Sequence, residues 1–300
     1  MTSYHDPVLL RESIDLLAIK SDGVYVDATF GGGGHSRAIL DQLGPQGRLF
    51  GFDQDDDAKA NAPNDPRFTF VNGNFRHLRR FLRLHGVTAI DGVLADLGVS
   101  SHQFDTAERG FSYRFEAGLD MRMNRNAGPT AADILNTYDP DDLQRLLGEY
   151  GEVRNARTLA HKIAEVRGKK PFRNVGDLLA VAEPLAKGQK MRYLSQVFQA
   201  LRMEVNEEVD VLKELLEGAL EILKPGGSLV VISYHSIEDR IVKNFLKTGN
   251  IEGEVQADFY GNITRPFDIA TKKAVNASDE EVSRNPRARS AKLRAGYRAN

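Results

Sequence analysis

Four consecutive glycines, Gly31 to Gly34, follow a buried-strand pattern that ends in an acid, Val24-Tyr25-Val26-Asp27. Because glycine has no side chain, this run lets the backbone turn sharply and approach a ligand closely. Ser36 to Leu40 then begin a helix whose free N–H groups face the turn. A strand, a glycine loop and a helix in this order can hold a nucleotide-like cofactor. A glycine-rich surface turn is the alternative, because Ser36 stands where a dinucleotide fingerprint has its third glycine.

A second strand pattern favours the cofactor interpretation. The run Arg48 to Asp53 is apolar and ends in a carboxylate about 20 residues after the glycines, a spacing at which an acid reaches ribose hydroxyls. Two further strand patterns follow, Phe68 to Val71 and Ala89 to Asp96, with a helical pattern between them. Strands that alternate with helices predict an α/β fold with a parallel, Rossmann-like doubly wound sheet.

The predicted sheet brings chemically useful residues to one edge. In sheets of this kind the ligand lies across the carboxyl ends of the strands. The residues expected to meet there are Asp27, Gly31 to His35, Asp53, Phe75 and Asp96. The neighbouring acids Asp55 to Asp57 lack the glycine and the terminal glutamate of a calcium loop, so they are predicted to be first-turn helix acids and no metal site is expected.

The alternation of strands and helices stops near residue 103. From there to Lys190 the sequence shows only helical patterns, over 139–149, 155–167 and 175–186, which predict an inserted helical domain. A long amphipathic helix is expected over 205–223, then a turn at 224–227, a buried strand over 228–234, a helix over 237–246 and a basic tail. The predicted domains are therefore 1–103 (first part of the α/β domain), 104–195 (helical insertion) and 196–300 (second part, with the tail).

Basic residues are unevenly distributed in a chain whose formal net charge is −2. Three segments are rich in Lys and Arg and nearly free of acids: 67–90, 154–173 and 283–300. A single run of this kind usually marks a solvated helix face or tail, but three runs in a near-neutral chain favour a polyanionic partner.

Composition also limits the compartment and the chemistry. The chain has no cysteine, which excludes disulfides, thiolate metal sites and cysteine nucleophiles. It has no apolar run long enough to span a bilayer, and its first ten residues lack a basic region followed by a hydrophobic segment. We therefore expect a cytoplasmic protein.

The first two strands alone do not decide between a nicotinamide cofactor and S-adenosylmethionine. Two features favour S-adenosylmethionine. The acid at the end of the first strand, Asp27, and the aromatic Phe75 after the third suit a sulfonium amino acid and an exposed adenine. A helix followed by Lys-Pro-Gly-Gly and a strand, as at 224–227, is also frequent late in methyltransferases.

Seven stretches spread along the chain resemble one family. They are His5-Asp6-Pro7-Val8-Leu9-Leu10, Asp27-Ala28-Thr29-Phe30-Gly31-Gly32-Gly33-Gly34-His35-Ser36, Asp96-Leu97-Gly98-Val99-Ser100-Ser101, Ala107-Glu108-Arg109-Gly110-Phe111-Ser112, Leu119-Asp120-Met121-Arg122-Met123, Ser233-Tyr234-His235-Ser236-Ile237-Glu238-Asp239-Arg240 and Asn285-Pro286-Arg287-Ala288-Arg289. By these the chain resembles the bacterial RsmH (MraW) family over nearly its whole length. That family methylates the exocyclic N4 of a cytosine in small-subunit (16S) ribosomal RNA.

The resemblance implies a class I S-adenosylmethionine methyltransferase fold with an inserted helical domain that helps to hold RNA. It implies cofactor contacts at Gly33, Gly34, His35, Asp53, Phe75, Asp96 and Gln103. The expected partner is 16S ribosomal RNA, within the small ribosomal subunit. Combined with the basic segments, this gives phosphate contacts at Arg157, Lys162, Arg167, Lys169, Lys170, Arg287 and Arg289.

The sequence departs from most amino-methyltransferases after the fourth strand. Those enzymes carry Asp, Asn or Ser followed by Pro-Pro and an aromatic, whereas this chain has Asp96-Leu97-Gly98-Val99. Asp96 is our candidate hydrogen-bond acceptor for the amine, with a contact to the cofactor alone as the alternative. Tyr234 and His235 are candidates for stacking on the base or orienting it, and ordinary packing at a strand end is the alternative.

Three other functions were weighed against this one. Ser233, His235 and Asp239 lie within seven residues and without a nucleophile elbow, so a hydrolase triad is not expected. An oxidoreductase on the same fold would bind nicotinamide, and an RNA-binding protein with a vestigial pocket would bind RNA without transferring a methyl group.

Overall fold

The computed structural model describes residues 7–255, 257, 263 and 265–300. His5 and Asp6, which belong to the first family motif, lie outside these residues. The chain divides into two compact units, 1–98 with 210–300, and 99–209. The second unit therefore begins earlier and ends later than the predicted insertion at 104–195. In the described residues, no helix is both long enough and apolar enough to cross a membrane.

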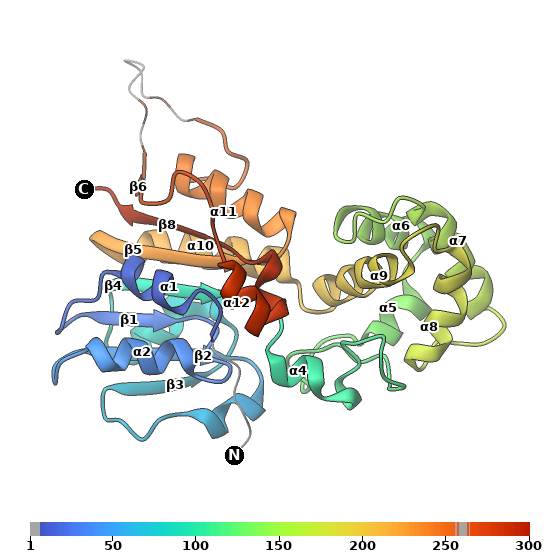
Figure 1. The fold of residues 1–300 in the computed structure, drawn as a ribbon, viewed down its shortest axis with the longest axis horizontal. Helices are drawn as coiled ribbons and strands as arrows, with labels where there is room; N and C mark the ends of the chain where they lie inside the picture. The colour runs from blue at the N-terminus through green and yellow to red at the C-terminus, as the bar shows by residue number, and fades with distance from the viewer. Residues whose placement is uncertain (1–6, 256, 258–262, 264) are drawn as a thin grey trace. The chain divides into compact units, whose positions relative to one another are not determined.

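The first unit is built on one mixed sheet with the strand order β3-β2-β1-β4-β5-β8-β6, with β7 paired to β8 (Figure 1). Its strands are β1 (Val24–Asp27), β2 (Arg48–Asp53), β3 (Phe68–Asn72), β4 (Ile90–Asp96), β5 (Leu223–Ser233), β6 (Phe267–Ile269), β7 (Val275–Asn276) and β8 (Lys292–Arg298). The first five in the sheet run parallel, which confirms the predicted doubly wound arrangement.

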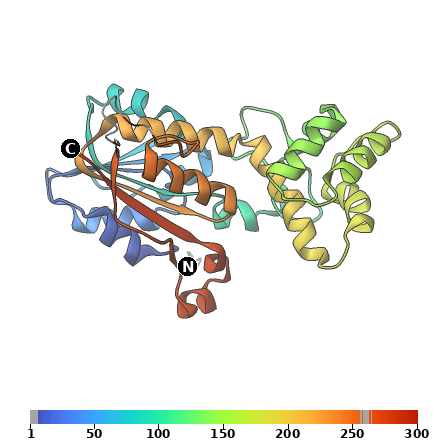
Figure 2. The same cartoon turned by 90° about the horizontal axis from the view of Figure 1, so that it is seen from above.

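Helices cover both faces of this sheet (Figure 2). The helices are α1 (Leu10–Leu17), α2 (Gly34–Gln42), α3 (Leu78–Leu84), α10 (Glu208–Ile222), α11 (Ser236–Thr248) and α12 (Asp279–Arg284), with short 3₁₀ helices η1 (Asp56–Asn61), η2 (Phe75–His77) and η5 (Pro286–Ser290). α1 and α2 pack on the face that carries Tyr25, Leu49 and Leu94. α3 and α10 lie side by side on the other face, where Arg76 and Arg79 pair with acids of α10. The sheet is therefore buried on both sides, as its nearly continuous apolar strands require.

The local predictions were accurate for the first strands and less so elsewhere. The bounds of β1 and β2 agree with the prediction, and Asp55 to Asp57 do begin a helix, of the 3₁₀ type. α1 begins at Leu10, directly after Leu9, which takes a left-handed backbone conformation with φ 51°. The expected turn at 224–227 lies inside β5 as an irregularity, where the register jumps between the Ile90–Leu223 and Gly92–Ser228 pairs.

The C-terminal segment was expected to be a basic tail, and the structure corrects this. Residues 292–298 form β8, which runs antiparallel between β5 and β6 inside the sheet. Arg294 donates from Nε to Asp239 on α11 at 2.6 Å, and Lys292 lies 3.5 Å from the same carboxylate. Alternation of basic residues with Leu293, Ala295 and a glycine is a strand pattern that the charge run concealed.

The second unit is helical and has a hydrophobic core of its own. It contains α4 (Ser101–Asp105), α5 (Ala131–Thr137), α6 (Pro140–Glu149), α7 (Ala156–Arg167), α8 (Val175–Ala182) and α9 (Lys190–Val205), with short 3₁₀ helices η3 (Ala107–Arg109) and η4 (Glu183–Leu185). The helices α6, α7 and α8 were predicted, whereas α5 and α9 were not. The helix expected over 205–223 is confirmed as α10, which begins at Glu208, after Glu207 takes a φ of 49°.

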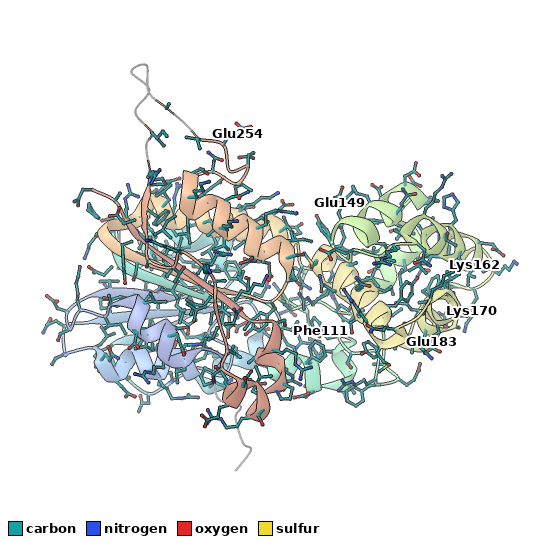
Figure 3. All side chains as sticks on the ribbon, turned by 45° about the horizontal axis from the view of Figure 1, so that its top comes forward. Phe111, Glu149, Lys162, Lys170, Glu183 and Glu254 are labelled. Carbon is teal, nitrogen blue, oxygen red and sulfur yellow. The ribbon has the colours of Figure 1, made fainter. Side chains whose placement is uncertain are left out.

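Two of the family motifs form a scaffold inside this unit. Arg109 is buried, with 2% of its surface exposed, and donates from Nη2 to the carbonyls of Arg122 and Met123 at 3.0 Å. Gly110, next to it, has a φ of 73°, and a Cβ there would lie 2.3 Å from the carbonyl oxygen of Gly118. These motif residues therefore hold the chain around Phe111, which belongs to the unit's core (Figure 3).

We expect Gly110→Ala to destabilise the second unit far more than Gly128→Ala. Both glycines have positive φ, but nothing lies within 4 Å of a Cβ at Gly128. The matched pair therefore separates backbone strain, worth about 1 kcal/mol, from a collision with the backbone, which should add about 2 kcal/mol or more. Scanning calorimetry measures this, and equal effects of the two variants would contradict the scaffold role of Gly110.

Candidate active site

Three carboxylates lie at the carboxyl ends of adjacent parallel strands. Asp27 ends β1, Asp53 ends β2 and Asp96 ends β4, and β1 lies between the other two strands in the sheet (Figure 1). This edge is where open α/β sheets bind their ligands. The structure therefore brings together the acids that the sequence placed there.

The glycine loop is attached to this acidic edge. Gly31 has a φ of 49° and donates its backbone N–H to Oδ2 of Asp53 at 2.8 Å. Asp53 also accepts from the backbone N–H of Asp55 through Oδ1 at 2.9 Å. Gly33 has a φ of 74° at the N-cap of α2, a conformation that favours glycine. Asp53 thus fixes the loop that starts the helix, in addition to any contact with a ligand.

Asp27 and Asp96 have neutral hydrogen-bond partners. Asp27 accepts from the hydroxyl of Ser36 at 2.7 Å and from the backbone N–H of Thr29 at 3.1 Å. Asp96 accepts from the phenol of Tyr234 through Oδ1 at 2.7 Å, and its own N–H donates to the hydroxyl of Thr29. The side chain of Asp96 keeps 22% of its surface exposed, so a ligand can reach it.

The imidazole ring of His35 is neutral near pH 7 because it is buried. Its Nε2 lies 3.1 Å from the carbonyl oxygen of Val8, and its Nδ1 lies 4.0 Å from Oδ2 of Asp96. Burial lowers the pKa of His35 to about 4, so the ring is neutral near pH 7 and does not supply a cation to Asp96. Donation from Nε2–H to Val8 leaves the lone pair of Nδ1 on the Asp96 side.

The neighbouring Gly34 also has a structural role. A Cβ at this position would lie 2.2 Å from Cγ of Pro7. Gly34 and His35, predicted as cofactor contacts, therefore both anchor the segment that precedes α1.

Burial raises the pKa of all three acids. The pKa of Asp27 and of Asp53 rises to about 6 and that of Asp96 to about 7, with desolvation as the largest cause in each case. The nearby charges of Asp27, Glu238 and Glu281 raise the pKa of Asp96 further, while the Tyr234 phenol opposes the rise. Ionising these buried carboxylates therefore costs free energy, and binding of a positively charged ligand would offset that cost.

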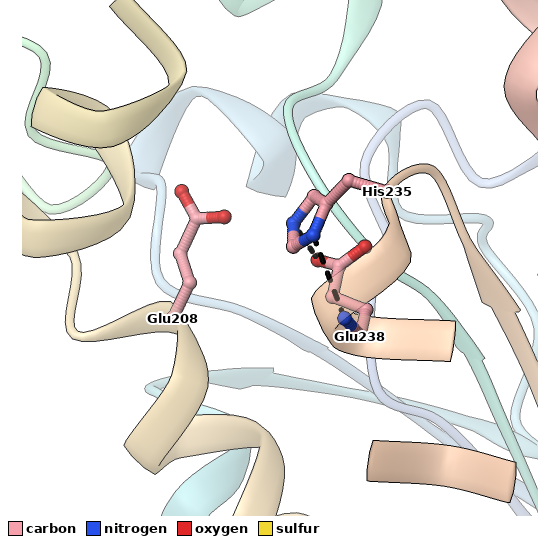
Figure 4. A group of neighbouring side chains, drawn as sticks. All are labelled: Glu208, His235 and Glu238. Carbon is pink, nitrogen blue, oxygen red and sulfur yellow. Dashed lines mark hydrogen bonds and ion pairs between the residues drawn. The ribbon is translucent and has the colours of Figure 1, made fainter. Parts of the chain in front are cut away.

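Tyr234 and His235 follow the last residue of β5, and Glu238 in the first turn of α11 contacts both. Figure 4 shows His235 and Glu238. Oε2 of Glu238 accepts from the backbone N–H of Tyr234 at 3.0 Å. Nδ1 of His235 accepts from the N–H of Glu238 at 3.5 Å, and Nε2 lies 3.0 Å from Oε1 of the same residue. That second contact is close in distance but poorly aligned for a hydrogen bond. The imidazole of His235 is therefore turned onto its own helix, as an N-cap.

The predicted site residues Phe75, Gln103, Arg287 and Arg289 lie on η2, α4 and η5. Phe75 is half-buried at the start of η2, after β3. Gln103 is buried in the second unit, where it forms a capping box with Ser100 at the start of α4. Arg287 and Arg289 are exposed on η5 of the first unit.

Most of the predicted phosphate contacts in the second unit have partners within it. Lys162 and Lys169 both pair with Glu165, and Lys170 pairs with Asp177 at 2.6 Å (Figure 3). Arg167 donates from Nη1 to the carbonyls of Leu135 and Tyr138, so it also links α7 to the end of α5. Arg157 is exposed on α7.

Sequence reasoning missed three residues of this site. Thr29 holds the backbone of Asp96, Glu238 holds Tyr234, and Glu281 on α12 accepts from the N–H of Leu9 at 2.7 Å. Glu238 carried a usable signal, because it stands three residues after His235 at the spacing of a capping box. The contacts of Thr29 and Glu281 join segments far apart in the sequence, which no local pattern shows.

We expect Asp96→Asn to stabilise the unliganded protein at about pH 8 but not at about pH 4.5. The pKa of Asp96 is raised in the folded state, so the folded protein loses stability as pH rises from about 4 to about 7. Asn does not titrate, and the gain should be about 1–2 kcal/mol, less than the full pKa shift implies, because the side chain is partly solvated. Urea unfolding at the two pH values measures this. A gain that is the same at both would show that the charge of Asp96 is not responsible.

Comparisons with known proteins identify the family of this chain. The model of the MraW methylase family matches residues 2–298. Ribosomal RNA small subunit methyltransferase H of Bacteroides thetaiotaomicron is 55% identical over 293 residues, which cover 97% of this chain and 96% of that protein. The protein of the same name from Flavobacterium johnsoniae is 56% identical over 292 residues, with 97% and 96% coverage. A solved rRNA methylase structure from Streptococcus thermophilus, covering 97% of this chain and 94% of that one, is 11% identical with a TM-score of 0.41, a likeness too weak to add to the assignment. The chain belongs to the MraW methylase family.

Proposed function

We propose that this protein transfers a methyl group from S-adenosylmethionine to the N4 amine of a cytosine in the 16S RNA of the small ribosomal subunit. The observation that carries the proposal is the edge formed by Asp27, Asp53 and Asp96, whose hydrogen-bond partners are neutral hydroxyls and backbone amides. Such a site complements a cationic ligand. Membership in the MraW methylase family, and relatives named for methylation of small-subunit ribosomal RNA, support the same reaction.

The residues at this edge fit S-adenosylmethionine. Gly31 and Gly33 carry no Cβ, and a Cβ at Gly33 would lie 2.9 Å from the ring of Phe30, so the loop keeps its tight turn before α2. We assign Gly33, Gly34, His35, Asp53, Phe75, Asp96 and Gln103 as the cofactor-binding set. When bound, the cofactor supplies an electrophilic methyl group, and the electron pair of its carbon–sulfur bond stays with sulfur.

Asp96 is the proposed acceptor for the amine. Oδ1 already accepts from Tyr234, so Oδ2, on the side of the neutral His35 ring, remains for an N4–H. Accepting this hydrogen bond localises the nitrogen lone pair, which otherwise delocalises into the cytosine ring. As the new carbon–nitrogen bond forms, the amine loses one proton, and the carboxylate of Asp96 takes it.

Tyr234 and His235 have separate roles in this proposal. The phenol of Tyr234 holds Asp96 and belongs to the site directly. His235 caps α11 and supports the strand end from which Tyr234 projects, so it acts by positioning Tyr234.

Ribosomal RNA would be held by Arg157, Lys162, Arg167, Lys169 and Lys170 on the second unit, and by Arg287 and Arg289 on the first. The pairs of Lys162, Lys169 and Lys170 with acids are exposed, and exposed pairs of this kind are worth only about 0–1 kcal/mol. A phosphate can therefore replace the carboxylate partner. Arg167 is the exception, because its carbonyl partners bind it within the fold.

The direct test uses labelled S-adenosylmethionine with small subunits from cells that lack this enzyme, followed by nucleoside analysis. We expect N4-methylcytidine as the labelled product.

Single-turnover transfer by Asp96→Asn at saturating cofactor and RNA should fall by roughly 10²-fold, the scale of a general-base contribution. A rate within a few-fold of the wild type would mean that Asp96 only holds the cofactor. RNA binding without transfer, or cofactor binding limited to nicotinamide, would overturn the proposed activity.

The acidic edge also predicts how cofactor affinity depends on pH. Since a sulfonium binds best to an ionised carboxylate, the affinity for S-adenosylmethionine should rise roughly tenfold or more as pH increases from 5.5 to 8, through the raised pKa of Asp96. S-adenosylhomocysteine lacks the positive charge and shares only the ribose contact of Asp53, so its affinity should change much less. Calorimetric titration of both ligands makes the comparison, and parallel curves would show that Asp96 does not recognise the sulfonium.

A further inference from the structure

Glu238 connects the first turn of α11 to the proposed amine acceptor. It is buried, with 3% of its surface exposed. Its Oε2 accepts from the backbone N–H of Tyr234 at 3.0 Å, and the phenol of Tyr234 donates to Oδ1 of Asp96 at 2.7 Å. Two hydrogen bonds, one to the backbone N–H of Tyr234 and one from its phenol, thus link α11 through this residue to Asp96 at the end of β4.

Helix capping alone does not explain this residue. In a capping box the residue at this position accepts from the N–H of the N-cap residue, here His235, whereas Glu238 accepts from the N–H of Tyr234, one residue earlier. Its charge also raises the pKa of Asp96 and of Tyr234.

We propose that Glu238 is a positioning residue for methyl transfer: it fixes Tyr234 so that the phenol occupies Oδ1 of Asp96 and Oδ2 is left for the substrate amine. The inference rests on the proposed function of Asp96. It assigns to Glu238 no contact with the cofactor or the base, and it places the effect of Glu238 in the orientation of Tyr234.

A double-mutant cycle tests this path. Single-turnover transfer is measured for Glu238→Ala, Tyr234→Phe and the double variant, at saturating cofactor and small subunits. If Glu238 acts through Tyr234, each single variant loses about tenfold in rate and the double variant is no slower than the slower single one, within about threefold. Losses that multiply in the double variant would show that Glu238 acts independently of Tyr234 and would overturn the proposal.

A second variant separates the charge of Glu238 from its hydrogen bond and covers the case in which Glu238→Ala does not fold. Glu238→Gln keeps an acceptor for the N–H of Tyr234 but removes the negative charge. Its rate at high pH should stay within about threefold of the wild type, and the acidic limb of the pH–rate profile should move to lower pH. The groups that face Asp96 and remain unchanged are Asp27 on β1, His35 on α2, Tyr234 at the end of β5 and Glu281 on α12.

Asp239→Asn is the matched control. Asp239 lies in the same turn of α11 but pairs with Arg294 and Lys292 of β8. This variant should lower the melting temperature without moving the pH–rate profile. An equal shift of the pH–rate profile in Glu238→Gln and Asp239→Asn would mean that Glu238 has only a structural role.

A spectroscopic readout keeps this inference separate from the proposed reaction. In protein labelled with [ζ-¹³C]tyrosine, the Tyr234 resonance is identified by its loss in Tyr234→Phe. It should shift in Glu238→Ala and stay in place in Asp239→Asn, whether or not the wild type methylates the RNA. A wild type without transfer activity but with this shift would overturn the proposed function alone. A Tyr234 resonance unchanged in Glu238→Ala would overturn the role of Glu238.

Discussion

The position of the Asp96 carboxylate depends on contacts from several segments of the first unit. This carboxylate sits at a strand end where burial raises its pKa to about 7, and its nearby base, His35, is neutral. The phenol of Tyr234 donates to one oxygen of this carboxylate, and the hydroxyl of Thr29 accepts from the backbone N–H of Asp96 and so fixes its position. Each of these partners comes from a different segment. The position of one acid therefore depends on β1, β4 and β5 together.

Two further contacts join segments that are far apart in the sequence near this edge of the sheet. Glu281 of α12 accepts from the N–H of Leu9, and His35 of α2 binds the carbonyl of Val8. Both contacts hold the segment that leads into α1, whose entry is strained by the left-handed backbone of Leu9. Strain that persists next to a site is maintained by the surrounding contacts, and here these come from both ends of the chain.

The sequence was sufficient to predict the elements that depend on local pattern. β1 and β2, the glycine loop and the acids at the strand ends follow from hydrophobic runs and from the special conformations of glycine. β8 was missed because its run of basic residues is typical of a solvated tail. In the structure Arg294 instead donates to Asp239 of α11, a contact that the local pattern does not show. α9 was missed altogether, although α10 was predicted close to its bounds, and the break between them at Glu207 carries neither glycine nor proline.

The candidate site shows the same limit more sharply. Residue type and spacing indicated that Gly34 and His35 lie in the cofactor loop, but not that they also hold Pro7 and Val8. A hydrogen bond such as that from Tyr234 to Asp96 joins positions 138 residues apart, so it depends on strand order and not on any window of sequence. Residue types and spacings in this sequence therefore indicate the chemistry of the candidate site better than they indicate its geometry. The sequence is enough to place three acids at strand ends, whereas only the fold shows that Tyr234 occupies one carboxylate oxygen of Asp96.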